Sequence, residues 1–216
     1  MTRRRIHPFA VLTVLLAIGL CTWPAYGQEG QESAIVKRVE QLQAKVSELE
    51  AQSEERHDDP EYFFELGNVY SDLAQREKAI AAYESALALN ADYVEVLVNL
   101  GSMQNEVGKS DEAIELLTRA AELRPEESKV WVNLGNAYYS KSEHYDAMQQ
   151  YRQALVVNER SYEAHYQIAV AYADVGIYRE AIREWQKVVE IAPDSDAAQS
   201  AKENIEVVEQ ILSRRL

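Results

Sequence analysis

A short motif recurs every 34 residues and constrains the fold of this chain more than any other feature. It is marked by a small residue, at Gly67, Gly101, Gly135 and Ala169. A period of this length is typical of one pair of antiparallel helices, which cannot bury its apolar face alone. Neighbouring pairs must therefore stack into a continuous core. We predict an all-α fold, an α-solenoid that works through a curved surface rather than through an active-site pocket.

When the four units are aligned on the small residue, residues at other positions also recur. We call each set of aligned positions a column. The four units span residues 60–93, 94–127, 128–161 and 162–195 without insertions. Each second helix carries a small and a large residue in fixed columns, at Ala79 and Tyr83, Ala113 and Leu117, Ala147 and Tyr151, and Ala181 and Trp185. Small side chains let two helices approach closely, and large ones on the same face fill the adjoining space. Chain reversals are expected at the helix stop signals Gly108, Gly176, Pro125 and Pro193.

These columns resemble the tetratricopeptide repeat, and four units of 34 residues cover 136 of the 216 residues. An aromatic column holds Tyr70, Tyr138 and Tyr172, whereas Gln104 departs from it. We expect looser packing of the second repeat at that position. The resemblance implies four helix pairs, a concave groove lined by the first helix of each pair, and the binding of a protein or peptide.

The first 27 residues have the composition of a secretory signal peptide. Arg3, Arg4 and Arg5 precede a largely apolar stretch at residues 8–20, and residues 25–27 place small side chains where a signal peptidase cleaves. Cleavage would make Gln28 the N-terminus of a periplasmic or secreted protein. The alternative is a retained membrane anchor at residues 8–26, because a spanning helix needs about 20 residues.

The chain is acidic and contains a single cysteine. Its formal net charge of −14 would become −17 without the three signal arginines, leaving 19 basic and 36 acidic residues. Such a charge disfavours nucleic acid and anionic lipid. It favours neutral or basic partners, or serves solubility alone. Cys21 lies in the signal segment, so the mature chain would hold no disulfide.

Residues 28–59 are rich in Glu, Gln and Lys and form a separate segment. Apolar residues occupy heptad positions d, a, d, a and d there, at Ile35, Val39, Leu42, Val46 and Leu49. This spacing predicts a short coiled coil and a homo-oligomer. The alternative is a solvated single helix or linker. The order of signal, coiled coil and repeats is similar to that of periplasmic coiled-coil and tetratricopeptide proteins associated with the Tol system.

Residues 196–216 contain no further helix pair. They carry one apolar stripe at helical spacing, formed by Ala197, Ala201, Ile205, Val208 and Leu212. We predict a helix that caps the last repeat, followed by a short tail, because the stacking face at the end of a solenoid would otherwise be exposed.

No pattern typical of an enzyme or a metal site occurs in the sequence. His57, His144 and His165 lie in different units, and His165 shares a packing column with Trp131. We find no glycine-rich phosphate loop, no nucleophile with its base and no paired carboxylates in a defined cleft. We therefore expect neither catalysis nor a bound cofactor or metal.

Side chains on the first helices are the candidates for ligand binding. By column, the groove should be lined by Phe64, Asn68, Glu95, Asn99, Ser102, Lys129, Asn133, Asn136, Tyr139, Glu163, Tyr166 and Gln167. Asparagine amides can both donate to and accept from an extended peptide backbone. The wider lining holds seven acids, namely Glu61, Glu65, Asp72, Glu95, Glu106, Glu163 and Asp174.

Chaperone-binding members of the tetratricopeptide repeat family grip a C-terminal carboxylate with a clamp of lysine, arginine and asparagine. Asn68, Asn99 and Lys129 match clamp columns, whereas Phe64 and Asn133 replace its other basic residues. The resemblance therefore favours recognition of a peptide segment over capture of a carboxylate.

These features predict an exported, non-enzymatic scaffold that binds a neutral or basic peptide segment in its groove. Two alternatives remain open. The protein is a structural spacer that oligomerises through residues 28–59, or an accessory subunit of a cell-envelope complex.

Overall fold

The structure, a computed structural model, describes residues 28–214, and the predicted signal peptide at residues 1–27 lies outside this part. The ten helices of the described part are α2 (Gln28–Ala51), α3 (Pro60–Asp72), α4 (Arg76–Leu89), α5 (Val94–Glu106), α6 (Ser110–Leu123), α7 (Ser128–Ser140), α8 (His144–Val157), α9 (Tyr162–Asp174), α10 (Tyr178–Ile191) and α11 (Asp196–Ser213). No strand occurs between residues 28 and 214, and the predicted all-α solenoid is confirmed.

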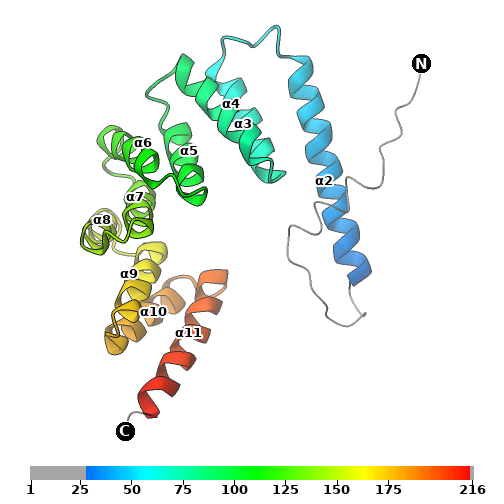
Figure 1. Cartoon of the computed structure of the whole chain (residues 1–216). Helices are drawn as coiled ribbons and strands as arrows, with labels where there is room; N and C mark the ends of the chain where they lie inside the picture. The colour runs from blue at the N-terminus through cyan, green and yellow to red at the C-terminus, as the bar shows by residue number, and fades with distance from the viewer. Residues whose placement is uncertain (1–27, 215–216) are drawn as a thin grey trace.

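Helices α3 to α10 form four consecutive pairs, and each pair packs against the next to build a curved array (Figure 1). Polar residues start several of these helices. The Asp59 carboxylate accepts a hydrogen bond from the Glu61 amide at 3.0 Å, and Pro60 begins α3. Ser161 and Ser195 cap α9 and α11 in the same way. Such caps satisfy backbone donors that lack a partner in the first turn.

The repeated small residue lies where the two helices of a pair come closest. A Cβ added at Gly67, Gly101 or Gly135 would lie 2.4–2.7 Å from the large residue of the second helix, which is Tyr83, Leu117 or Tyr151. Contacts that short do not occur between carbon atoms, so these pairs require glycine. The fourth pair instead combines Ala169 with Trp185, and both are buried.

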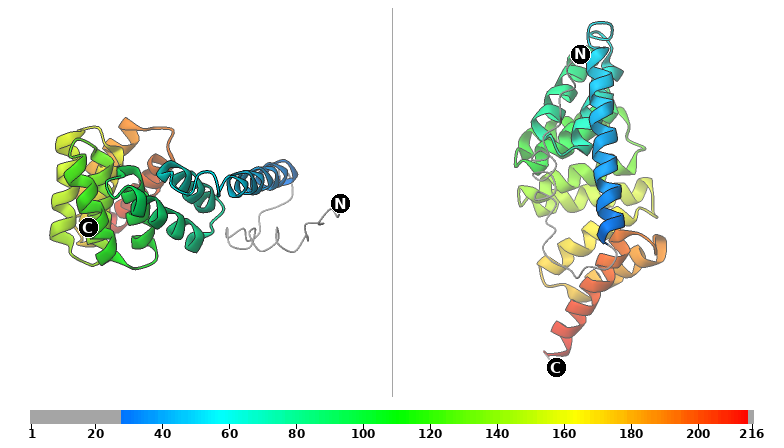
Figure 2. Two further views of the ribbon diagram at one scale, coloured as in Figure 1. Left: turned by 90° about the horizontal axis from the view of Figure 1, so that it is seen from above. Right: turned by 90° about the vertical axis from the view of Figure 1, so that its right-hand side faces the viewer.

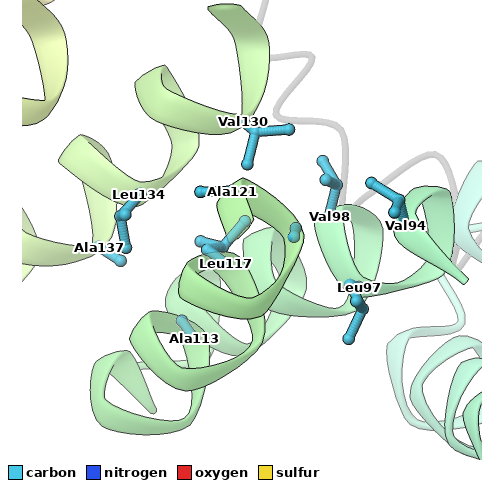
Figure 3. Packing of buried hydrophobic residues seen from close by; sticks show 10 residues of the cluster. Val94, Leu97, Val98, Ala113, Leu117, Ala121, Val130, Leu134 and Ala137 are labelled. Atoms are coloured by element: carbon cyan, nitrogen blue, oxygen red, sulfur yellow. The ribbon is translucent and has the colours of Figure 1, made fainter. Parts of the chain in front are cut away.

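Buried apolar side chains join each pair to its neighbours. Figure 3 shows one such cluster, in which Leu97 of α5, Leu117 of α6 and Leu134 of α7 belong to a single buried group. A fully buried leucine contributes roughly 1.5–3 kcal/mol relative to an exposed one. The stability of each helix therefore depends on its neighbours in the stack.

The C-terminal part of α2 packs on α3 as the second helix of an incomplete repeat. Counting back one period from α4 places Leu49 in the column of Tyr83. Leu49 is completely buried, and Val46 packs against the apolar cluster of the first pair. Tyr70 of α3 donates a hydrogen bond to the Glu50 carboxylate at 2.8 Å. The first repeat is thus covered by residues that the heptad pattern assigned to a coiled coil.

The N-terminal part of α2 extends past the end of α3 (Figures 1 and 2). The heptad residues Ile35, Val39 and Leu42 of α2 remain only partly buried within this chain. The coiled coil therefore stays a prediction, and it concerns mainly these three residues.

Helix α11 covers the other end of the solenoid. Ala201 and Val208 of α11 share a buried cluster with Trp185 and Val188 of α10. Helix α11 therefore caps the last repeat, as predicted.

None of the helices within residues 28–214 is both long enough and apolar enough to cross a membrane.

Candidate peptide-binding groove

We call the surface formed by the first helices α3, α5, α7 and α9 the groove. In Figure 1, α5 and α7 lie on the inside of the arc, and their partners α6 and α8 lie outside. Between α3 and α5 the surface contains an open hollow of about 330 Å³, lined by Asn68, Ser71, Asp72, Tyr83, Asn99, Ser102, Met103 and Glu106. The structure thus brings together five of the predicted lining residues, namely Asn68, Asn99 and Ser102 with the acids Asp72 and Glu106.

Two hydrogen bonds hold the amides of this hollow in place. The Asn68 carbonyl oxygen accepts from the Tyr83 hydroxyl at 2.7 Å and from the Asn99 amide nitrogen at 3.1 Å. Burial raises the pKa of the Tyr83 hydroxyl, which therefore stays protonated and able to donate. No further side chain of residues 28–214 bonds the Asn68 amide nitrogen or the Asn99 carbonyl oxygen. The hollow therefore offers one oriented donor and one oriented acceptor.

The third pair repeats this arrangement, because the Asn136 carbonyl oxygen accepts from the Tyr151 hydroxyl at 2.9 Å. An asparagine directly after the small residue occurs only where the second helix carries a tyrosine. The remaining pairs have neither, with Ser102 and Leu117 in one and Val170 and Trp185 in the other. This signal was present in the sequence. It identifies Tyr83 and Tyr151, which column reasoning had assigned to the core alone, as residues that also hold groove asparagines in place.

Arginines from neighbouring segments pair with several acids of the groove. Arg124, at the end of α6, bonds Glu95 at 2.6 Å. Burial raises the pKa of Glu95, but the hydrogen bond from Arg124, a backbone hydrogen bond and the charge of Arg124 together lower it overall. Three further pairs are Arg56 with Glu65 at 3.2 Å, Arg38 with Asp72 at 3.5 Å and Arg76 with Glu106 at 3.8 Å.

The acid excess of the groove is consequently smaller than its lining alone indicates. Sequence reasoning missed these arginines because they come from α2, α4 and loops rather than from the first helices. Exposed ion pairs of this kind contribute only about 0–1 kcal/mol. A cationic ligand can therefore exchange with them at little cost.

Tyrosine hydroxyls engage two more of the acids. Tyr93 donates to Glu61, and Tyr139 of α7 donates to Asp174 of α9. The ring of Tyr139 also packs edge-on against His144, with ring centroids 4.9 Å apart. Tyr139 therefore joins the third and fourth pairs, and its ring rather than its hydroxyl is the part that a ligand would meet.

Two apolar lining residues are already packed within the chain. The ring of Phe64 lies 5.2 Å from that of Tyr93. Tyr166 packs against the cluster that contains α11, and its hydroxyl accepts from the Asn204 amide at 3.4 Å. Helix α11 thus covers the C-terminal end of the groove beside Tyr166.

The other predicted lining residues are accessible. Lys129 and Glu163 are exposed, while Asn133 and Gln167 are partly buried. Glu163 accepts a hydrogen bond from the Ser161 hydroxyl at 3.2 Å. These four residues extend the polar surface of the groove along α7 and α9.

His165 is buried, as its packing column indicated. Its Nδ1 lies 2.6 Å from the Glu184 carboxylate and its Nε2 lies 3.1 Å from the Glu159 carbonyl oxygen. Burial raises the pKa of Glu184, but the hydrogen bonds from His165 and Lys187 lower it overall. Among the described residues, no three His, Cys, Asp or Glu side chains gather closely enough to hold a metal ion.

Tetratricopeptide repeat families match the sequence over residues 64–127, 135–176 and 162–195. No curated protein matches it. Neither these families nor the solved structures below bear the name of an enzyme.

Several solved structures share the fold. MamA is 21% identical, with a TM-score of 0.64, over 79% of this chain and 96% of MamA. YrrB, a TPR protein with an unusual peptide-binding site, is 20% identical, with a TM-score of 0.61, over 79% of this chain and 88% of YrrB. PilW, a type IV pilus biogenesis factor, is 15% identical, with a TM-score of 0.67, over 85% of this chain and 90% of PilW. The family matches and the stacked helix pairs together show that this chain belongs to the tetratricopeptide repeat family of protein–protein interaction scaffolds.

Proposed function

We propose that this protein is an exported, non-enzymatic scaffold that binds a neutral or basic peptide segment in the groove. One observation carries the proposal. The amides of Asn68 and Asn99 meet in one hollow, bonded to each other at 3.1 Å. An extended peptide presents backbone N–H and C=O groups, and one oriented donor with one oriented acceptor is suited to bind them.

The charge of the groove sets the expected preference among peptides. Asp72 and Glu106 line the hollow beside the two asparagines, and both are exposed. Their arginine partners, Arg38 and Arg76, lie 3.5 and 3.8 Å away and are also exposed. A lysine or arginine of a ligand would replace these weak pairs, whereas an acidic segment would meet two carboxylates.

Peptides selected from a displayed library against this protein provide ligands for a test. Replacing Asn99 and Asn133 together by alanine should weaken binding about tenfold at every salt concentration, since each lost hydrogen bond costs roughly 0.5–1.5 kcal/mol. Replacing Glu95 and Glu163 by glutamine should mainly flatten the salt dependence, because exposed charges are screened over about 8 Å at physiological ionic strength.

The control for this test is Glu122→Ala, an exposed position on α6. Asn68 is left intact because its loss would also remove the hydrogen-bond acceptor of Tyr83. Peptides that bind every groove variant as they bind the parent would place the binding site elsewhere.

Export rests on the N-terminal sequence, in which three arginines precede an apolar stretch and a small-residue cleavage site. The intact mass of the protein recovered from its host should be that of a chain starting at Gln28. A full-length chain in the membrane fraction would instead indicate the retained anchor.

A second candidate function, that of an oligomeric spacer, is favoured by α2. Ile35, Val39 and Leu42 form a partly exposed apolar stripe on α2. Two such stripes can pack together in a coiled coil. A monomer at all concentrations in sedimentation would remove this candidate.

A further inference from the structure

A hollow lies on the opposite side of the first helices from the groove, where α4, α5 and α6 meet. Four leucines line it, Leu87, Leu97, Leu100 and Leu116, together with the polar side chains of Glu84 and Gln104. Its volume is about 480 Å³. It opens between the second helices α4 and α6, so it is independent of the peptide groove.

The hollow lies where the repeat pattern lacks an aromatic ring. Gln104 stands in the column of Tyr70, Tyr138 and Tyr172. In the other three pairs the tyrosine ring packs among apolar side chains of the adjoining clusters. A glutamine fills less of this space, and Leu87 and Leu116 beside it are only partly buried, whereas Leu97 and Leu100 are buried.

A hydrogen bond is missing at the same position. Gln104 is 6% exposed, and its carbonyl oxygen has no partner within the described part of the chain. A buried acceptor without a donor costs about 1–3 kcal/mol. The hollow is therefore lined by a residue with an unsatisfied acceptor.

The chain itself shows which chemical group suits this position. One period earlier, the Tyr70 hydroxyl donates to the Glu50 carboxylate at 2.8 Å across the interface of α2 and α3. Glu84 stands in the column of Glu50, just as Gln104 stands in the column of Tyr70. At the interface of α4 and α5 the carboxylate is thus present, and the phenol is absent.

Charges at the rim of the hollow favour a basic surrounding for that phenol. Glu84, Glu112 and Glu115 line the hollow and are exposed. Arg119 is the cation among the lining residues, and it is paired with Asp92 at 2.6 Å. Basic residues beside the docked ring would meet these carboxylates, and acidic ones would be repelled.

We propose that the hollow beside Gln104 is a docking site for a tyrosine side chain of a partner protein, presented between basic residues. The ring replaces the missing aromatic residue of the column and covers the accessible parts of Leu87 and Leu116. The hydroxyl donates to the Glu84 carboxylate or to the Gln104 carbonyl oxygen.

Blocked tripeptides test this proposal, with binding mapped by NMR on the isotope-labelled protein. Lys-Tyr-Lys should shift amide signals in residues 84–119. Lys-Phe-Lys should bind about tenfold more weakly, because it lacks a hydrogen bond to a charged acceptor. Glu-Tyr-Glu should also bind more weakly. Equal binding of the tyrosine and phenylalanine peptides, or shifts confined to the groove, would overturn the proposal.

Variants at Gln104 give an independent measurement. Gln104→Tyr restores the residue of the column, so it should raise the Tm and abolish binding of Lys-Tyr-Lys. Gln104→Leu should reduce the preference for tyrosine over phenylalanine, and Glu190→Ala on α10 serves as the control. A lower Tm for Gln104→Tyr, or unchanged peptide binding by it, contradicts the proposed site. If p-cresol alone binds as tightly as the peptide, the site takes a free phenol and the protein partner is wrong.

Discussion

At the scale of single residues, each turn between the helices of a pair depends on one left-handed backbone position. The four positions recur at the 34-residue period, with φ of 55° at Ala74, 82° at Gly108, 63° at Ser142 and 78° at Gly176. Two of them are glycine, as expected from the stop signals, and two are not. A side chain in this conformation costs roughly 1–2 kcal/mol. Ala74 and Ser142 therefore hold strain that the stacked helices impose.

We expect Gly108→Ala to lower the free energy of unfolding by about 1 kcal/mol and Ala74→Gly to raise it by up to the same amount. Nothing lies within 4 Å of a Cβ placed on Gly108, so the change there is purely conformational. Ala81→Gly, at an exposed position within α4, should instead lower stability by about 1 kcal/mol. Urea unfolding measures all three. A loss of stability in Ala74→Gly would refute the strain at that turn.

At the scale of elements, α2 serves two patterns at once. Val46 and Leu49 fit both a heptad seam and the columns of a second repeat helix. The structure uses them in the second way, because Leu49 is completely buried within this chain. Leu42 is only partly buried and remains accessible to a partner helix.

Leu49→Ala and Leu42→Ala separate these two uses of α2. Truncating a buried leucine costs about 2–5 kcal/mol, so Leu49→Ala should clearly lower the Tm. Leu42→Ala should change the Tm of the dilute protein much less. It should affect mainly the concentration at which the protein associates, as measured by sedimentation. Equal losses of Tm for both variants would contradict the assignment of α2 as half a repeat.

At the scale of the whole molecule, tyrosine hydroxyls connect helices along the solenoid. Tyr70 of α3 bonds Glu50 of α2, and Tyr83 of α4 bonds Asn68 of α3. Tyr139 of α7 bonds Asp174 of α9. Burial, followed by the bond to a carboxylate, raises the pKa of Tyr70 and of Tyr139 to about 12. Burial also raises the pKa of Tyr151.

This distribution predicts alkaline unfolding. The folded chain keeps protons that the unfolded chain releases near pH 10, so stability is unaffected below that value and falls as pH rises toward 12. Loss of helical circular dichroism should coincide with the late part of the tyrosinate absorbance change. Tyr70→Phe should make the loss of stability with pH shallower, since it removes one such proton. Complete tyrosine ionisation with helicity intact would contradict this coupling.

The 34-residue period was sufficient to predict the repeat and most of its geometry. Gly135 and Tyr151 recur in fixed columns because helices must approach closely at one point and fill the adjoining space. The same periodicity assigned Asn68, Asn99 and Ser102 to first helices, and all three line one hollow between α3 and α5. These features recur in each helix pair, so the periodicity of the sequence is sufficient to predict them.

Features that depend on contacts between distant elements could not be predicted from the repeat columns. Arg124 pairs with Glu95 from the end of another helix, and α11 covers Tyr166, although nothing in their own columns indicates either contact. The missing ring at Gln104 was visible in the sequence. Whether its space would be refilled depended on how far α4 and α6 could close over the position. Leu87 of α4 and Leu116 of α6 line the hollow beside Gln104, which remains open.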